Sequence, residues 1–376
     1  MKIAIFHNFL DNIGGAEMVD LLLARELGAD IYTTNIDSEK IKKMGFSDIL
    51  SRIYSIGKVP INAPFKQEFS YWKFRFLNVE KRFGKKYDFY IIAGDWAMAG
   101  AIHNKPNLWY VYSPIREIWD LHKYTRNNIV PGRSRFLFDL WVAYRRILNR
   151  FDSSYVQKIV SISKNVQGRV KKYLKRDSIV IYPPTETRKF HFKKSKGYWL
   201  AVNRLIGHKR IELQLGAFAK IPREKLVIVG SYEKSEHFLK YANHCMKIKP
   251  KNVEIKNWVN DKELVELYAN CKGFITTSQD EDYGMNVVEA MASGKPVIAP
   301  NEGGYKETVV NGATGILIDE INEEKLINEI KKISLELKKN PFKYKKVCLE
   351  QAKKFDAGGF IEKIKEEINI FKGDNL

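Results

Sequence analysis

Residues 276–304 read TTSQDEDYGMNVVEAMASGKPVIAPNEGG. A short apolar run ends at Thr276, and a polar loop then leads into an apolar, helix-forming stretch that begins near Asn286 or Val287. The segment continues with SGKPVIAP, a turn followed by another short apolar run. Short buried runs joined by helices are typical of parallel sheets with helices on both faces. The segment therefore predicts one strand–helix–strand unit of an α/β fold.

The same alternation extends along most of the chain in both directions. Further strand-like runs occur at residues 3–7, 89–93, 108–112, 159–163, 179–182, 199–202, 226–229, 273–276, 296–299 and 316–318. They are interrupted by YPPTETRKFHFKKSKGY, Tyr182–Tyr198, where two prolines and many charges leave no periodic apolar face. This pattern predicts two doubly wound parallel-sheet domains with a linker between them. An amphipathic helix is expected near the C-terminus, after a change of direction at Gly358-Gly359.

The composition is that of a folded, basic protein. The chain has 376 residues, 64 Lys and Arg against 44 Asp and Glu, a formal charge of +20, and 44% hydrophobic residues. That hydrophobic content excludes a disordered basic chain. Three widely spaced cysteines without a CxxC indicate neither a disulfide framework nor a zinc site. The N-terminal apolar run is too short for a signal peptide, and no run approaches the ~20 apolar residues of a membrane span. We expect a cytoplasmic protein.

Most of the positive charge lies in the first half. The segment from Lys123 to Arg176 has 14 basic and 2 acidic residues, a net charge of +12, interleaved with aromatic residues. A second basic and aromatic stretch runs from Phe65 to Lys86. Such stretches fit a nucleic-acid surface, a surface that faces anionic lipid, or a helix whose charges are merely solvated. Two of them in one half favour an anionic partner.

Three loops carry groups that suit a phosphorylated ligand. Gly14-Gly15 forms a strand-to-helix turn whose backbone amides can face an anion. Arg204 and Lys209 follow the first strand of the second half, at the end where open α/β sheets bind ligands. In the opening segment, Glu281 lies on the loop and Glu289 one turn into the helix.

These residues carry a family resemblance. E-D-Y-G-M-N-V-V-E resembles the E-x7-E signature of retaining glycosyltransferases of family 4, which have the two-Rossmann fold called GT-B. N-R-L-I-G-H-K-R resembles the family's S-R-L-x-x-x-K-R, and Y-S-P-I-R-E-I-W-D resembles its H-T-P-x-R-x-x-W-D. With G-G-A-E, V-S-I-S-K-N-V and V-I-Y-P-P, the matches follow the family's order along nearly the whole chain. The resemblance implies an acceptor-side domain at 1–188, a nucleotide-sugar-binding domain at 189–357, and a helix at about 358–376 that crosses back to the first domain.

The resemblance also implies a role for each matched residue. Arg204 and Lys209 would neutralise the diphosphate of the donor, Glu281 would bond the hydroxyls of its sugar, and Glu289 would hold the ribose. The other donor-binding positions implied are Gly14, Gly15, Asn257 to Val259, Gly284, Met285, Asn286 and Val287. On the acceptor side they are Arg116 and Asp120. No metal or other cofactor is expected, because the cation pair takes the place of a metal ion.

Three residues need separate treatment. Tyr112 stands where the family loop has a histidine, so its hydroxyl is expected to supply a hydrogen bond at the catalytic site. With a pKa around 10, it cannot act as a general base near neutral pH. The run Asp280-Glu281-Asp282 imitates a metal-binding D-x-D, but no second acidic cluster accompanies it, and we assign no metal. His7, at the tip of the first strand, is interpreted as structural.

The function favoured by the sequence is transfer of a hexose, with retention, to a glycan or lipid-linked acceptor. Mannose from GDP-mannose is the leading donor. Two alternatives stay open: a nucleotide-sugar epimerase on the same fold, and a basic nucleic-acid-binding protein on a transferase scaffold. The intact site residues disfavour the second, so no nucleic-acid partner is expected. The excess charge of the first half instead predicts docking on an anionic membrane surface, at the cytoplasmic face, or on a phosphorylated acceptor.

Overall fold

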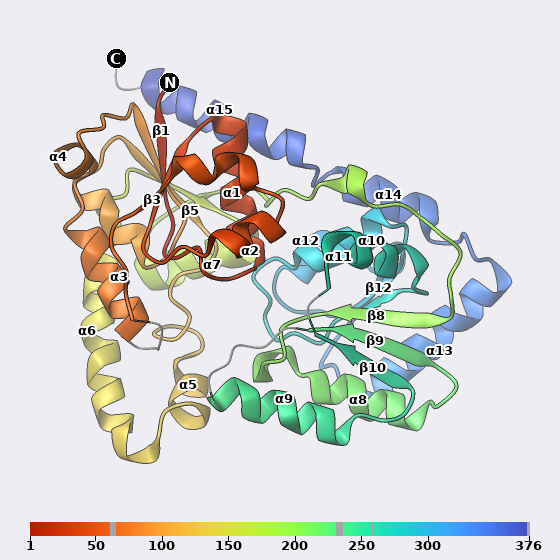
Figure 1. The fold of residues 1–376 in the computed structure, drawn as a ribbon. Helices are drawn as coiled ribbons and strands as arrows, with labels where there is room; N and C mark the ends of the chain where they lie inside the picture. The colour runs from red at the N-terminus through yellow and green to blue at the C-terminus, as the bar shows by residue number, and fades with distance from the viewer. Residues whose placement is uncertain (61–64, 231–235, 258, 374–376) are drawn as a thin grey trace. The chain divides into compact units, whose positions relative to one another are not determined.

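The computed structural model describes residues 1–60, 65–230, 236–257 and 259–373. The chain forms two compact units (Figure 1). The first unit is Met1–Tyr182 together with the chain from Ile361 onward, and the second is Pro183–Phe360. The chain first passes from one unit to the other at the start of the segment predicted as the linker.

A seven-stranded sheet forms the centre of the first unit. Its strand order is β3-β2-β1-β4-β5-β6-β7, and every neighbouring pair is parallel. The strands are β1 (Ile3–Phe6), β2 (Asp30–Thr33), β3 (Ile53–Ser55), β4 (Phe89–Ile92), β5 (Asn107–Val111), β6 (Lys158–Ser161) and β7 (Ile179–Val180). The helices are α1 (Gly15–Leu27), α2 (Ser38–Lys43), α3 (Phe65–Arg75), α4 (Val79–Phe83), α5 (His122–Asn128), α6 (Arg135–Ser153) and α7 (Lys164–Arg169).

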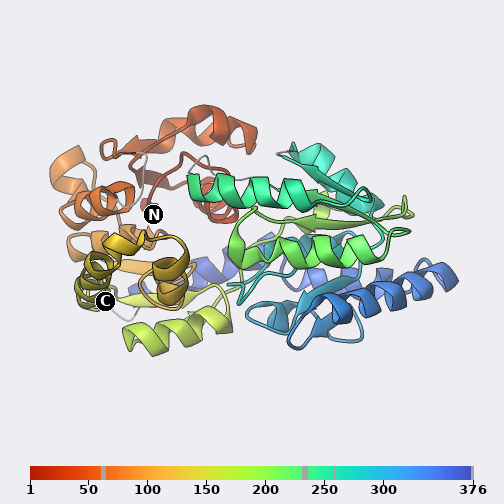
Figure 2. The ribbon, with the colours of Figure 1, turned by 90° about the horizontal axis from the view of Figure 1, so that it is seen from below.

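The second unit repeats the plan with six strands. Their order is β10-β9-β8-β11-β12-β13, again all parallel, with helices on both sides of the sheet (Figure 2). The strands are β8 (Tyr198–Val202), β9 (Lys225–Val229), β10 (Val253–Lys256), β11 (Phe274–Ile275), β12 (Val297–Pro300) and β13 (Gly315–Ile318). The helices are α8 (Ile211–Lys220), α9 (Glu236–Ile248), α10 (Asp261–Asn270), α11 (Met285–Ala292), α12 (Tyr305–Thr308), α13 (Glu323–Lys339) and α14 (Lys345–Lys353).

The predicted α/β class is confirmed by these two sheets. All ten predicted strands are present with ends within two residues of the prediction. Three further strands, β2, β3 and β10, were not predicted. β3 and β10 lie at sheet edges, where burial is partial and the sequence is not continuously apolar. Within each sheet, the carboxyl ends of the central strands lie at the same edge. Ligand-binding loops gather at this edge in open α/β folds.

The last helix, α15 (Ala357–Gly373), packs on the first unit through an apolar face. Ile364 and Ile368 are fully buried, and the Phe371 ring lies 5.7 Å from that of Phe89. The turn predicted at Gly358-Gly359 is wrong, because both glycines lie inside the helix. The Asp356 carboxylate accepts a hydrogen bond from the Gly358 amide and so stabilises the helix start. Residues 374–376 of the predicted helix lie outside the described residues.

Candidate active site

The amino end of α11 is built for close approach by a ligand. Gly284 precedes the helix with φ +86°, in the left-handed region, and no side chain caps the helix. A Cβ at this position would lie 2.5 Å from the ring of Tyr305, so both the backbone conformation and the packing require glycine. The first amides of α11 are therefore left for an anion or a sugar hydroxyl.

Lys209 and Glu281 meet beside this helix. Lys209 ends a short 3-10 turn after β8, and Glu281 lies on the loop after the neighbouring strand β11. Their Nζ and Oε2 atoms are 2.5 Å apart, and both side chains are largely buried. The Tyr305 hydroxyl lies 3.5 Å from the same carboxylate oxygen and 2.8 Å from the hydroxyl of Thr276. The structure thus brings together the cation and the carboxylate that the sequence predicted as partners of one ligand.

The loop that carries Glu281 is fixed by a second loop, NEGG, residues 301–304. The two carboxylate oxygens of Glu302 accept from the Arg210 guanidinium at 3.1 Å and from the Asp280 amide at 3.1 Å. At Gly303, where φ is +55°, a Cβ would lie 2.3 Å from the carbonyl oxygen of Glu281. Backbone therefore lies directly against backbone, and the position of Glu281 depends on this contact.

The other predicted donor-binding residues of this unit lie around the same sheet edge. Glu289 is half-buried and accepts a hydrogen bond of 2.7 Å from the Tyr268 hydroxyl, and burial raises the pKa of its carboxyl group. The Asn286 amide donates to the carbonyl oxygen of Val202 at 2.7 Å, which ties α11 to the end of β8. Arg204 is exposed directly after β8.

The predicted donor-binding segment at residues 257–259 follows the edge strand β10. Asn257 is exposed and Val259 is half-buried, whereas Trp258, between them, lies outside the described residues. The side chains of Met285 and Asn286 are half-buried and that of Val287 is buried, and the Val287 amide donates to the carbonyl oxygen of Gly284 at 3.1 Å.

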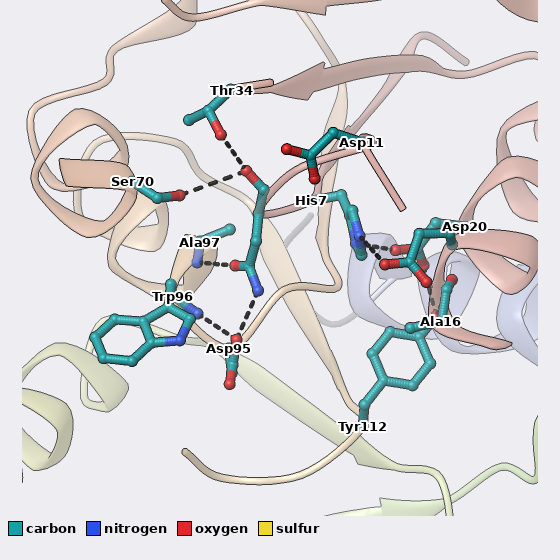
Figure 3. A network of polar contacts seen from close by, with 12 residues as sticks. His7, Asp11, Ala16, Asp20, Thr34, Ser70, Asp95, Trp96, Ala97 and Tyr112 are labelled. Carbon is teal, nitrogen blue, oxygen red and sulfur yellow. Dashed lines mark hydrogen bonds and ion pairs between the residues drawn. The ribbon is translucent and has the colours of Figure 1, made fainter. Parts of the chain in front are cut away.

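In the first unit, a buried ion pair supports the Gly14-Gly15 turn. The Nδ1 of His7, at the end of β1, lies 2.5 Å from the Asp20 carboxylate of α1, and neither side chain is appreciably exposed (Figure 3). Burial alone would lower the pKa of His7, but Asp20 outweighs it and raises the pKa to about 10. Glu17 contributes from 3.9 Å, and its carboxylate occupies the space that a Cβ on Gly14 would need.

Tyr112 is attached to the same pair. Its hydroxyl lies 2.6 Å from Asp20 Oδ1 and 3.2 Å from the carbonyl oxygen of Ala16 (Figure 3). Burial and the Asp20 charge raise the pKa of Tyr112 well above its ordinary value. The hydroxyl therefore stays protonated and acts as a donor within the support of the glycine turn.

A neighbouring network joins three strand ends through Asn8. Its side chain donates to Asp95 at 2.6 Å and accepts from the Ala97 amide at 2.8 Å, while its carbonyl accepts from the Thr34 hydroxyl at 2.7 Å (Figure 3). Burial raises the pKa of Asp95. The network holds the carboxyl ends of β1 and β4 in place below the glycine turn.

The predicted acceptor-side residues form a further cluster. Arg116 binds one carboxylate oxygen of Asp120 through two nitrogens, at 2.9 and 2.7 Å. Arg169 approaches the same carboxylate at 3.8 Å and donates to Ser113 at 3.0 Å. Two guanidinium groups thus converge on one carboxylate beside Tyr112.

The family model for glycosyl transferases group 1 matches residues 163–355, just over half of the chain. This chain is a group 1 glycosyltransferase. The family 4-like assignment made from the sequence is confirmed by this match. The described residues contain no group of three or more His, Cys, Asp or Glu side chains arranged to hold a metal ion.

Relatives of this glycosyltransferase carry matching names. An uncharacterised glycosyltransferase of Methanocaldococcus jannaschii is 27% identical over 56% of this chain and 57% of its own. The alpha-1,3/1,6-mannosyltransferase ALG2 of Dictyostelium discoideum is 29% identical over 39% of this chain and 44% of its own. The chain thus spans about half the length of these curated relatives.

The fold also matches that of solved glycosyltransferases. Anabaena HepE, solved with UDP and glucose, superposes with a TM-score of 0.72 over 98% of this chain and 99% of its own, at 17% identity. The GT-B fold expected from the sequence is therefore confirmed.

Several residues of the site were not predicted. Tyr305 and Glu302 hold the Glu281 loop, Tyr268 holds Glu289, and Asp20 holds His7. The NEGG sequence was a signal for the first two, because consecutive glycines after a strand mark close backbone approach. Tyr268 and Asp20 lie on other helices, where spacing gives no indication of the contact.

Proposed function

We propose that the chain is a retaining glycosyltransferase that moves a hexose from a nucleotide-diphosphate sugar to a glycan or lipid-linked acceptor, without a metal ion. The observation that carries the proposal is the contact of Lys209 with Glu281 beside the uncapped amino end of α11. The three features provide a cation and helix amides for a diphosphate and a carboxylate for a sugar.

In the reaction, charge develops on the diphosphate as the bond to the anomeric carbon breaks. Arg204, Lys209 and the α11 amides would stabilise that charge. Glu281 would hold the sugar hydroxyls and face the positive charge at the anomeric carbon. In the structure the Glu281 carboxylate neutralises Lys209 at 2.5 Å, so donor binding has to redirect the ammonium group towards phosphate. Capture of the sugar on the face from which the diphosphate leaves would give retention.

Mannose from GDP-mannose is the donor that we propose. Support comes from the sequences of the two loops N-R-L-I-G-H-K-R and Y-S-P-I-R-E-I-W-D and from the name of the mannosyltransferase relative. UDP in the solved HepE structure supports the competing uridine donor. Thermal stabilisation by GDP-mannose, UDP-glucose and an ADP-sugar decides between the bases, since a ligand at 100 times its Kd adds about 2.7 kcal/mol to the apparent stability.

The test of the reaction uses Lys209→Ala and Glu281→Ala. We expect each to lower transfer by roughly 100- to 1,000-fold, the loss typical of removing one stabilising group from a transition state. Lys272→Ala is the matched control, since Lys272 forms a comparable ion pair with Glu224 at 2.6 Å in the same unit. Full transfer by either site variant would refute the proposal. An NMR assignment of the product's anomeric configuration tests retention.

A further inference from the structure

Helix α6 buries polar residues and exposes apolar ones, the reverse of an ordinary surface helix. Its buried side contains Arg145, Asn149 and Asp152, each at most 3% exposed. Its exposed side carries large apolar residues at helical spacing: Phe136, Leu137, Leu140, Tyr144, Ile147 and Phe151. Ile147 is 69% and Leu137 is 66% exposed. Scattered single apolar residues are normal on a surface, but a continuous stripe along one helix marks an interaction site.

The polar side of α6 is accounted for by its neighbour α3. Arg145 lies over the ring of Tyr71 at 3.7 Å, and Asp152 accepts from the Tyr71 hydroxyl at 2.5 Å and from Arg75. The Trp141 indole donates to Glu68 at 2.7 Å. The contacts follow the same order along both helices, which therefore run parallel, side by side (Figure 1). The apolar stripe is therefore not the core side of α6, because polar contacts with α3 occupy that side.

The second helix adds to the same exposed face. Phe65 and Phe69 of α3 and Phe76, the residue that follows α3, are more than half exposed, and Trp72 stacks on Phe76 at 5.7 Å. These residues recur every three or four positions, about a quarter turn away from the residues that contact α6. In a parallel pair of helices this offset directs both exposed stripes to one side of the unit. We name the combined surface the α3–α6 face.

Cations border the α3–α6 face. Arg146 and Arg150 are held by hydrogen bonds from Nε to the carbonyl oxygens of Ile118 and Tyr173, and both stack on Trp119. Among the described residues, no carboxylate pairs with either of them. A cavity of about 520 Å³ between α5 and α6 is lined by Lys123, Arg126 and Arg146 and by Asp139, which pairs with Arg126 at 2.7 Å. An apolar stripe flanked by Arg146 and Arg150 matches a bilayer surface with anionic headgroups.

We propose that the α3–α6 face inserts into the headgroup region of an anionic lipid bilayer and holds the enzyme on the membrane surface. This deepens the proposed function, on which it rests for the nature of the acceptor, by naming the surface that reaches it. A second copy of the chain is the poorer occupant, because a two-fold contact would set Arg146 and Arg150 against their own counterparts. Spanning is not involved: no helix in the described ranges is long and apolar enough to cross a bilayer.

Vesicle flotation tests the proposal in the absence of any sugar donor, so its outcome is independent of transfer. The wild type should bind vesicles of phosphatidylcholine with phosphatidylglycerol, more weakly at high salt, and phosphatidylcholine alone poorly. Leu140→Glu with Ile147→Glu should lower binding by roughly tenfold or more, because two apolar side chains lose their burial. Leu335→Glu is the control, since Leu335 is 61% exposed on α13 in the other unit.

Three outcomes would overturn the proposal. The first is absence of wild-type binding to anionic vesicles, and the second is undiminished binding by the double variant. The third is a lipid-free dimer in sedimentation equilibrium that Ile147→Glu dissociates. Vesicles with brominated acyl chains distinguish insertion from attachment that depends on charge alone, because bromine quenches tryptophan fluorescence only at close range. Quenching that is lost in Trp72→Phe supports insertion, and unquenched tryptophan fluorescence at saturating vesicles contradicts it. Failure here with intact GDP-mannose or UDP-glucose binding would leave the proposed function standing.

Discussion

Replacing Asp20 by Asn should remove a pH-dependent part of the protein's stability. Asp20 is fully buried, 2.5 Å from His7 and 2.6 Å from the Tyr112 hydroxyl. Breaking a buried ion pair by neutralising one partner typically costs about 3–5 kcal/mol. We therefore expect Asp20→Asn to lower the free energy of unfolding of the first unit by about that amount near pH 6.

The difference in free energy of unfolding between the wild type and Asp20→Asn should shrink as the solution becomes alkaline. The pKa of His7 is about 10 in the folded chain and 6.5 ordinarily. Because the folded value is the higher one, the stabilisation is complete below about pH 6.5 and is lost as the pH rises through about 10. Urea unfolding of both proteins at several pH values between these limits, followed by near-UV circular dichroism, measures the change.

A surface pair provides the control. Asp139 contacts His122 at 3.0 Å and Arg126 at 2.7 Å, but these side chains are about a third or a fifth exposed. Asp139→Asn should therefore cost much less stability than Asp20→Asn. If the difference in free energy of unfolding between the wild type and Asp20→Asn stays constant from pH 6 to pH 10, His7 and Asp20 do not form a charged pair. Tyr112→Phe, which removes only the hydrogen bond to Asp20, should keep the pH dependence.

Two predictions concern the Glu281 loop. Gly303→Ala places a Cβ 2.3 Å from the Glu281 carbonyl oxygen, so sugar transfer should be lost. Gly312→Ala is the control: with φ +80° and no atom within 4 Å of the new Cβ, it should cost only about 1 kcal/mol of backbone strain and keep activity. Equal activities of the two variants in a transfer assay would contradict this. Tyr305→Phe removes the hydroxyl 3.5 Å from Glu281 and should lower kcat by roughly tenfold with little change in donor KM; a raised KM with unchanged kcat would show that the hydroxyl serves donor binding instead.

The sequence predicted the parts of the fold that depend on continuous burial. Central strands such as β5 and β12 are buried at every residue and are apolar runs, which periodicity detects. β10, with the sequence VEIK, is buried only at its first residue, and β3 is buried at none. Their place at the sheet edge comes from pairing with β9 and β2, which is a long-range contact. Local patterns hold no information about such a contact.

The candidate site divides in the same way. Glu281, Glu289 and Lys209 could be identified because their spacing along the chain forms a motif. Tyr305 directly follows the NEGG signal, but the contacts of its ring with Gly284 and of its hydroxyl with Glu281, 24 residues away, depend on the folded sheet. The basic segment around α6 was predicted by charge, but its apolar exposed face was not. Periodicity shows that a helix is amphipathic and does not show which side faces the core.

The assignment of α15 to the first unit sets an order of events during translation. Residues 183–360, which form the second unit, leave the ribosome before the helix that covers Phe89. At 5–20 residues per second, the first 182 residues wait roughly 9 to 36 s for their last helix. During that interval the partners of Ile364 and Ile368 stay uncovered while the second unit can already fold. The nascent chain is therefore expected to need chaperone protection at its older end, and the second unit to be the first to become resistant to protease.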